Sequence, residues 1–278
     1  SIATIALCFM LYALCFMLKS LSVGQSPPLT ANFLTFAPPQ FAKIMSKKQK
    51  SIFNKESLTF LENYLNNPSP TGFEKEGQKL WLKYLTPYID EYFVDAYGSA
   101  VGVINPKAEF KVVIEAHADE ISWFINYISP EGLLYVIRNG GSDQQIAPSK
   151  RVNIHTEKGT VKAVFGWPAI HTRVRSGDGK EPQPKVENIF LDCGARSRKE
   201  VEDLGIHVGC VCTFEDGFEE LNYDYIICRA IDNRIGGFMI AEVARLLKEK
   251  KQQLPFGLYI VNAVQEEVGL RGAEMIAK

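Results

Sequence analysis

The chain has 278 residues, of which 46% are hydrophobic, and a formal net charge of -1 at pH 7. This length and apolar content are ample for one large domain, or two smaller ones, with a packed core. Acidic and basic residues are mixed along the chain, which argues against the clustered basic face of a nucleic-acid-binding protein. The six cysteines form no CxxC pair, and the four beyond Met45 are expected to be reduced thiols of a cytoplasmic protein.

Residues 1–45 need a separate interpretation. Residues 2–18 are almost wholly apolar, which leaves open a membrane-targeting leader followed by a proline-containing spacer. Against this, the chain begins with Ser1, the hexapeptide ALCFML occurs twice, and a polar run followed by an amphipathic pattern begins after Met45. We therefore interpret 1–45 as upstream sequence translated by mistake, with Met45 as the natural start, and we expect no attachment to a membrane.

After Met45, helical and strand-like patterns follow one another as in an α/β domain. Helices are predicted from apolar spacing at 52–65, at 74–86 before Pro87, at 234–251, and from about Gly272 onward. Strands are predicted at 91–97, 100–104, 111–117 and 256–264. The third of these strands is a near-continuous apolar run, which is typical of a strand buried on both faces.

The pattern changes between residues 122 and 213. Helical periodicity disappears, and short runs such as ISWFINYI and TVKAVFG alternate with Gly, Pro and Asp turns, which predicts a small all-β unit. A polar, Pro- and Gly-rich segment at 176–185 is expected to be a surface loop. The simplest architecture is an α/β domain made of 46–121 and 214–278, interrupted by a β insert at 122–213.

A histidine and an aspartate follow the strand predicted at 111–117. His117 is at its C-terminal end, where open α/β sheets place their ligands. Asp119 is two residues further on, and residues two apart in an extended chain face the same side. Its carboxylate is therefore expected to support the orientation of His117, as carboxylates do behind metal-bound histidines. A surface His–Asp pair at a strand end is the alternative.

Three further carboxylates complete the candidate site. Asp232 follows a predicted buried strand, as His117 and Glu267 do, so all three could gather at one edge of the same sheet. Because a helix follows it, Asp232 is expected either to cap that helix or to bridge two cations. Glu266 and Glu267 end an apolar strand, where burial without compensating cations would be unfavourable. One of them could bind a metal while the other acts as a general base, and a solvated loop pair is the alternative. Histidine with carboxylates suits zinc, cobalt or manganese.

Several ordered motifs resemble those of the tetrahedral and glutamyl aminopeptidases, a family of dinuclear metallopeptidases in which some members carry an endoglucanase label. The motifs are NPSPTGFE (67–74), HADEI (117–121), NGGSDQQIAPSKRVNIHTEKGTVKAVFG (139–166), DCGARSRKEVEDLGIHVG (192–209), AIDNRIGG (230–237) and VQEEVGLRGA (264–273). The resemblance runs from about Lys47 to Lys278. It implies a phosphorylase/hydrolase-like α/β fold with a mixed sheet, and an inserted β-barrel lid used for dimer contacts and, in relatives, for a hollow dodecamer.

The resemblance also implies a role for each candidate residue. His117 and Glu267 would each bind a metal, Asp232 would bridge two metals, Asp119 would support His117, and Glu266 would be the general base. The implied activity is the removal of N-terminal residues from short peptides with two divalent ions, zinc or cobalt, with manganese also suitable. The implied state is a homo-oligomer without nucleic-acid or membrane partners.

Three alternatives to an aminopeptidase stay open from the sequence. One is another dinuclear amidohydrolase, such as a deacetylase or a carboxypeptidase. Another is a non-catalytic binding protein, against which the general base expected at Glu266 argues. A glycosidase is disfavoured, because its two carboxylates must flank the scissile bond and neighbours in sequence make a poor pair for that.

The resemblance finally implies ligands that residues 1–278 do not supply, namely one more carboxylate beyond Glu267 and a histidine near the C-terminus. His155, His171 and His207 fall in the β insert and are not placed to substitute. The α/β domain is therefore expected to be C-terminally truncated here. We predict that residues 1–278 alone bind at most one metal, weakly, and have little peptidase activity. Measurable cleavage of an aminoacyl chromogenic substrate by the purified chain with added cobalt would contradict this prediction.

Overall fold

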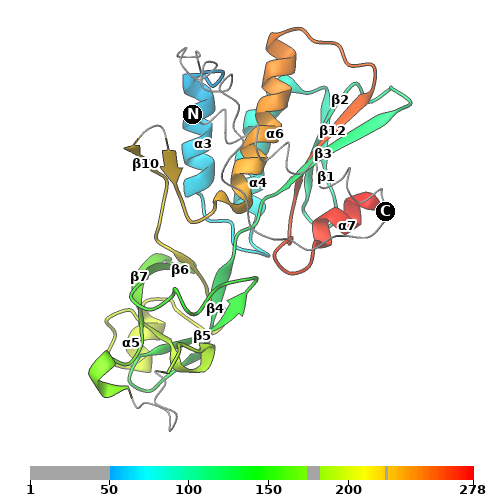
Figure 1. The fold of residues 1–278 in the computed structure, drawn as a ribbon. Coiled ribbons are helices and arrows are strands. Elements are labelled where there is room, and N and C mark those ends of the chain that lie inside the picture. The colour runs from blue at the N-terminus through cyan, green and yellow to red at the C-terminus, as the bar shows by residue number, and fades with distance from the viewer. Residues whose placement is uncertain (1–50, 174–181, 223–224) are drawn as a thin grey trace, which may run out of the picture. The chain divides into compact units, whose positions relative to one another are not determined.

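A computed structural model describes residues 51–173, 182–222 and 225–278 (Figure 1). Residues 1–45, interpreted above as upstream sequence or alternatively as a leader, and residues 176–181 of the expected surface loop lie outside the described residues. The chain divides into two compact units, one formed by 59–219 with 226–278 and a smaller one that includes 220–225. Within the described ranges, no helix combines the length and the apolar character that crossing a membrane would take.

The predicted helices are all present, with small differences at their ends. They are α3 (Lys55–Asn66), α4 (Lys75–Leu85), α6 (Ile231–Glu249) and α7 (Arg271–Ala277). The first begins later than predicted because the side chain of Asn54 accepts the backbone N–H of Ser57 at 2.8 Å, as an N-cap does. Beside these, a short helix, α5 (Arg198–Asp203), lies within the segment predicted to be all β.

The α/β part is built on a four-stranded mixed sheet with the order β1-β2-β12-β3. Its strands are β1 (Glu91–Val94), β2 (Ala100–Ile104), β3 (Lys111–His117) and β12 (Gly257–Ala263). β12 runs parallel to β3 and antiparallel to β2. The sheet is mixed because β2 runs antiparallel to both of its neighbours, β1 and β12, whereas β12 and β3 are parallel. The predicted α/β class is therefore confirmed.

The prediction that the strand at 111–117 is buried on both faces is wrong. In the described part of the chain, β3 is at the edge of the sheet, and only Ala116 and His117 in it are buried. The strand that is buried along almost its whole length is β12, because it lies between β2 and β3. A run of apolar residues alone does not tell an edge strand from a central one.

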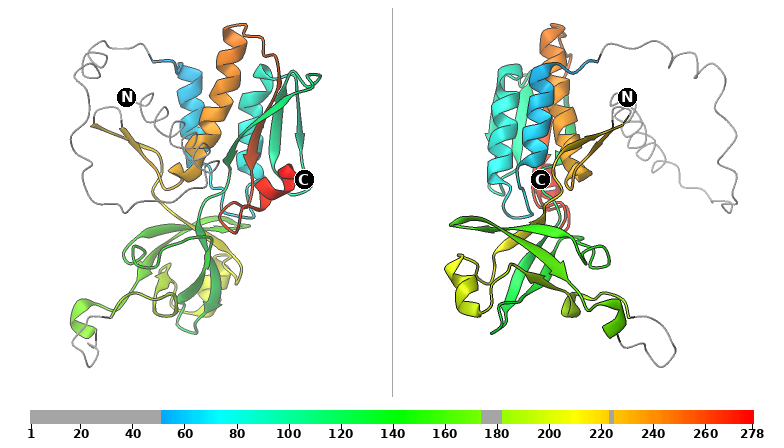
Figure 2. Two further views of the ribbon diagram at one scale, coloured as in Figure 1. Left: turned by 45° about the vertical axis from the view of Figure 1, so that its right-hand side comes forward. Right: turned by 90° about the vertical axis from the view of Figure 1, so that its left-hand side faces the viewer.

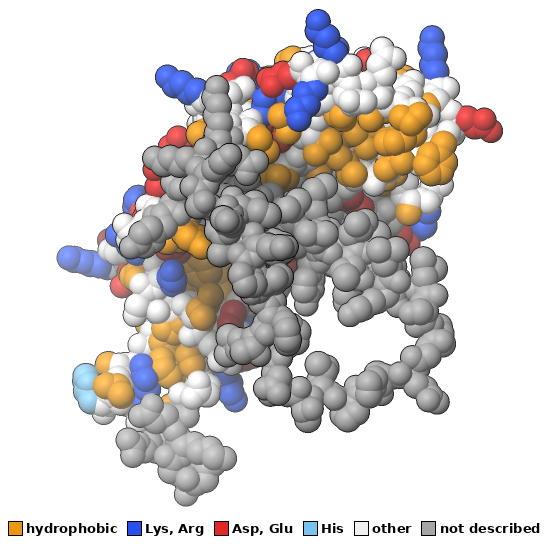
Figure 3. Space-filling model, turned by 45° about the horizontal axis from the view of Figure 1, so that its top comes forward, with side chains coloured by type: hydrophobic (Ala, Val, Ile, Leu, Met, Phe, Trp, Pro, Cys, Tyr) orange, Lys and Arg blue, Asp and Glu red, His pale blue; other side chains and the backbone are white. Residues whose placement is uncertain are grey.

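Helices lie on both faces of this sheet (Figure 2). α3, α4 and α6 pack together on one face, where Phe60 stacks on Tyr84 with ring centroids 4.0 Å apart and also meets Phe238. α7 contributes Ile276 to the other face, against a cluster of buried strand residues that includes Val101 and Val261. That second face keeps exposed apolar side chains, and hydrophobic side chains gather on the surface shown in Figure 3.

Six strands between Ser122 and Phe214 form a closed antiparallel barrel with the strand order β4-β5-β8-β7-β6-β9. Its strands are β4 (Ser122–Ile128), β5 (Leu134–Asn139), β6 (Arg151–Thr156), β7 (Gly159–Gly166), β8 (Phe190–Asp192) and β9 (Val211–Phe214). A buried cluster fills it, in which Trp123 meets Phe165 edge-on with centroids 5.3 Å apart. The predicted barrel insert is therefore confirmed as an element of the fold.

The close approach of α4 to β2 depends on a glycine. A Cβ atom at Gly102 would lie 2.5 Å from Leu85 Cδ2 and 3.1 Å from Ile89 Cδ1. Leu85 is fully buried, so it has no free space into which to move. Gly102 therefore sets the distance between the helical layer and the sheet.

We predict that Gly102→Ala lowers the free energy of unfolding by about 1–3 kcal/mol, the usual cost of overpacking a core. The urea midpoint of purified protein measures the change. Val94→Ala on the exposed surface of β1 is the control and should shift stability by no more than about 0.5 kcal/mol. A Gly102→Ala protein as stable as the wild type would show that the helical layer moves freely on the sheet.

Candidate metal centre

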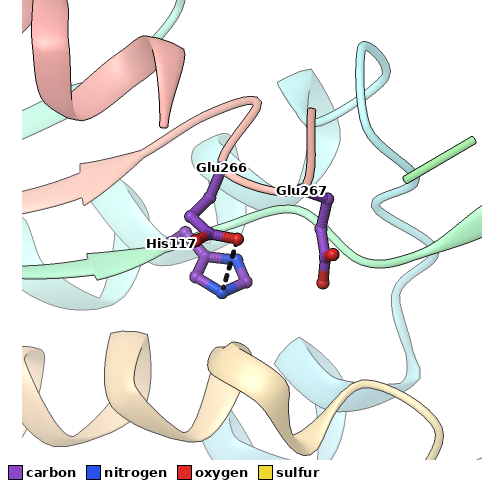
Figure 4. A group of neighbouring side chains, drawn as sticks. All are labelled: His117, Glu266 and Glu267. Carbon is purple, nitrogen blue, oxygen red and sulfur yellow. Dashed lines mark ion pairs between the residues drawn. The ribbon is translucent and has the colours of Figure 1, made fainter. Parts of the chain in front are cut away.

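The candidate residues meet where two parallel strands end. His117 is the last residue of β3 and is paired in register with Ala263, the last residue of β12. The chain leaves β12 through Val264 and Gln265 and then reaches Glu266 and Glu267. Because parallel neighbours end at the same edge of a sheet, residues far apart in sequence are brought together there. Figure 4 shows the side chains of His117, Glu266 and Glu267 and the segments that carry them.

The side-chain donors converge on His117. Its Nε2 atom lies 3.4 Å from Asp232 Oδ1 and 3.6 Å from Glu266 Oε2. One donor atom from each of His117, Glu266 and Glu267 lies within 4.8 Å of the other two. The imidazole itself is buried, while Glu266 is about one-third exposed, so solvent reaches the carboxylate side of the group.

Asp119 lies behind this group and is fully buried. Its Oδ1 atom is 3.3 Å from His117 Nδ1 and accepts the backbone N–H of Glu266 at 3.0 Å. Its Oδ2 atom accepts the backbone N–H of Glu267 at 3.2 Å and the hydroxyl of Thr71 at 2.8 Å. One carboxylate therefore holds both the histidine and the backbone of the two glutamates.

The electrostatics follow from burial and from these contacts. Burial alone would lower the pKa of His117, but Asp119, Glu266 and Asp232 outweigh it and raise that pKa. Burial alone would raise the pKa of Asp119, but the bonds from His117 and Thr71 outweigh it and lower that pKa. Burial raises the pKa of Glu267. The site thus holds several carboxylates around one imidazole, an arrangement that favours positive charge.

The structure places Asp232 differently from the sequence-based expectation. The strand before it, β11 (Tyr225–Ile227), pairs with β10 (Glu219–Leu221) in a separate two-stranded sheet, so Asp232 does not follow a strand of the central sheet. Its side chain is 92% exposed apart from the approach to His117. Asp232 and Asn233 interrupt the first turn of α6 with non-helical dihedral angles, and no side chain caps that helix. The capping alternative therefore lacks a hydrogen bond to support it.

The residues fit a metal ion by their donor set. Across the described ranges, no lysine or arginine forms an ion pair with Asp232, Glu266 or Glu267. With Nδ1 facing Asp119, the Nε2 atom of His117 is directed toward the carboxylates and is the nitrogen available to a metal. A histidine nitrogen with carboxylate oxygens suits zinc, cobalt or manganese. The other described histidines lie elsewhere, and His155 Nε2, for example, is 2.9 Å from Thr213 Oγ1 in the barrel.

Asp119 aside, sequence reasoning assigned no role to the residues that support this centre. Thr71 bonds to Asp119 from the loop between α3 and α4, and it belongs to the motif NPSPTGFE. Glu120, the neighbour of Asp119, is buried and accepts hydrogen bonds from Ser69 N at 2.8 Å and from Arg229 Nη2 at 3.2 Å. The only signal in the sequence was the presence of both loops within quoted motifs.

The chain matches a family of known proteins. The family model described as M42 glutamyl aminopeptidase matches residues 98–278. The putative aminopeptidase FrvX of Escherichia coli (strain K12) is 32% identical over 224 residues, which are 80% of this chain and 61% of that protein. The chain thus spans about three fifths of the length of this relative.

Solved structures give the same result. The TET aminopeptidase from the marine sediment archaeon Thaumarchaeota archaeon SCGC AB-539-E09 matches with a TM-score of 0.76 and 30% identity, over 80% of this chain and 63% of that one. The Pyrococcus horikoshii TET1 peptidase, described as able to assemble into a tetrahedron or a large octahedral shell, matches with a TM-score of 0.69 and 27% identity, over 80% and 65%. The family match covers well over half of the chain, and the chain belongs to the M42 glutamyl aminopeptidase family.

Proposed function

We propose that this protein is a two-metal aminopeptidase that removes N-terminal residues from short peptides. The observation that supports the proposal most is the buried carboxylate of Asp119, which holds His117, Glu266 and Glu267 at one edge of the sheet. The family membership supports the reaction class. The four described cysteines are free thiols, which suits the cytoplasmic location that we include in the proposal.

In this proposal, His117 and Glu267 would each hold a metal ion, and Asp232 would be shared between two divalent ions. Zinc and cobalt suit the donor set, and manganese also does. Bound cations would polarise the scissile carbonyl. They would also lower the pKa of a bound water molecule to near neutrality. The chain's own contribution is to hold the donors in place, because Asp119 fixes the imidazole ring from behind and the two glutamate amides from one side.

Glu266 is the proposed general base. Its carboxylate lies next to the imidazole of His117 yet is partly open to solvent, so an attacking water molecule can reach it. It takes the proton as the water oxygen bonds to the carbonyl carbon of the peptide. It returns that proton to the nitrogen of the leaving peptide as the C–N bond breaks. Glu267 is adjacent and takes the other task, that of metal ligand, since its side chain leaves the same turn at a separate point (Figure 4).

We also propose a homo-oligomer in which the barrel takes part in contacts between copies and covers the site as a lid. The assembly described for the Pyrococcus horikoshii relative supports an oligomer. The barrel lies between His117 and Asp232 in the sequence, and its first strand, β4, begins at Ser122, shortly after His117.

The choice of Glu266 as base gives a direct test. In the natural gene product, Glu266→Gln should lower kcat for an aminoacyl p-nitroanilide by about 10²–10⁴-fold, because the amide cannot accept the proton. Metal content, measured by atomic emission, should stay the same. Glu274→Gln, a change on the exposed face of α7, is the matched control and should leave kcat unchanged.

The same assay separates the aminopeptidase from the other amidohydrolases. A free N-terminal amine should be required, so the N-acetylated form of the substrate should not be cleaved. Faster cleavage of the N-acetylated substrate would favour a deacetylase or related enzyme. Full activity of the Glu266→Gln protein would refute the assignment of the base.

The role of Asp119 gives a second test. Asp119→Asn keeps the size of the side chain, but its single carbonyl oxygen cannot accept both glutamate amides and support His117. We expect metal affinity to fall by about 10–100-fold, measured by competition with a chelating dye. Asp192→Asn, which affects a carboxylate bonded to Gly194 N in the barrel, is the control. Equal affinity in Asp119→Asn and the wild type would contradict the supporting role.

A further inference from the structure

The turn that carries the two glutamates is held by a second buried carboxylate, that of Glu74. Its Oε1 atom accepts the backbone N–H of Gln265 at 3.1 Å, and also that of Gly72 at 2.9 Å. Glu74 is 5% exposed and lies in the loop that leads into α4. It is distant in sequence from Gln265 and contacts it only because the loop between α3 and α4 lies against the end of β12.

Together, Glu74 and Asp119 bind three amides in a row. Glu74 accepts the N–H of Gln265, and Asp119 accepts those of Glu266 and Glu267. Each of these bonds pairs an ionisable acceptor with a buried or half-buried donor, and such bonds are among the stronger ones in proteins. The direction in which the chain leaves the sheet edge is therefore fixed at every residue from Gln265 to Glu267.

This turn needs external support because its backbone is unusual. Gln265 has a φ of 55°, in the left-handed region that residues with a side chain seldom adopt. Without the bond from its amide to Glu74, Gln265 would gain by returning to an extended conformation. That change would rotate the following peptide groups and so move Glu266 and Glu267.

Apart from one bond within its own loop, the contact with Gln265 is what the buried carboxylate of Glu74 provides in the described chain. Glu74 is the N-cap residue of α4, yet its side chain makes no capping bond to that helix. Its second bond, to Gly72, lies within its own loop, where Gly72 has a φ of 89°. Burial raises the pKa of Glu74, so keeping a carboxyl group in this position has a cost in free energy. A leucine or methionine would fill the volume without that cost.

We propose that Glu74 is a positioning residue for the candidate site: its Oε1 atom fixes the amide of Gln265 and thereby the direction of Glu266 and Glu267. It acts as a hydrogen-bond acceptor, so its negative charge is not required. The consequence for catalysis rests on the proposed function. The consequence for the backbone of 265–267 does not.

Two substitutions separate the acceptor from the charge. Glu74→Gln keeps a carbonyl oxygen at the position of Oε1, and Glu74→Ala removes it. Hydrogen–deuterium exchange of the peptide that contains 264–268 reports on the backbone, and kcat and KM for an aminoacyl p-nitroanilide report on the site, both in the natural gene product. Asp90→Ala is the control. It also removes a carboxylate that accepts a backbone N–H, that of Asn105 at 2.7 Å, but this bond lies at the end of β2 that is remote from the candidate site.

We expect exchange at 265–267 to rise by about fivefold or more in Glu74→Ala and to stay near wild type in Glu74→Gln. We expect kcat to fall by about 10–100-fold in Glu74→Ala with KM changed less than threefold, and to be largely retained in Glu74→Gln. Asp90→Ala should leave both measurements unchanged.

Two outcomes would overturn the proposal. Equal losses in Glu74→Gln and Glu74→Ala would show that the charge matters, and unchanged exchange in Glu74→Ala would show that Glu74 does not hold the turn. If the exchange pattern is as expected but neither the wild type nor any variant cleaves a free-amine substrate, the positioning role stands and the proposed function fails.

Discussion

The carboxylate of Asp119 is the group on which the candidate site depends. It is removed from solvent, so its charge must be balanced by hydrogen bonds, and it receives them from Thr71, Glu266 and Glu267 while facing His117. In a low-dielectric interior such a network is strong when every member is satisfied and unfavourable when one is missing. Its four partners come from three separate parts of the chain. The site therefore forms only when the loop before α4, the end of β3 and the end of β12 are all in place.

The sheet topology makes that meeting possible. β12 is inserted between β2 and β3 and runs parallel to β3, so both strands deliver their last residues to one edge. The barrel is inserted between the two strands in sequence, which separates His117 from Glu266 along the chain without separating them in space. The barrel also reaches back to the site. Asn139, at the end of β5, donates to Thr71 O at 2.9 Å and to Ser122 Oγ at 2.8 Å.

Gly140, the next residue, shows how closely this contact is made. A Cβ atom there would lie 2.9 Å from the Cβ of Glu267, and the residue has a φ of 74°. Both facts require glycine.

Two arginines lie near the site without neutralising it. Arg229 binds Glu120, and the guanidinium of Arg234 lies over the ring of Tyr64 at 4.0 Å. Arg229 and Arg234 are thus engaged elsewhere, and the carboxylates around His117 stay available for cations.

The sequence by itself determined the α/β class, the position of the β insert, most helix and strand bounds, and the five candidate residues. These depend on local spacing and on motifs, which are properties of neighbouring residues. It misjudged β3 as buried on both faces, and it placed Asp232 after a strand of the central sheet, because periodicity carries no information about which strands become neighbours. It gave no role to Thr71 or Glu74.

Only the tertiary structure decided those roles, since a bond from Glu74 to Gln265 or from Thr71 to Asp119 joins segments far apart in the chain. The physical reason is backbone pairing between distant segments: β12 pairs with β3, and Pro70 pairs with Glu120, so the loop before α4 and the ends of both strands meet.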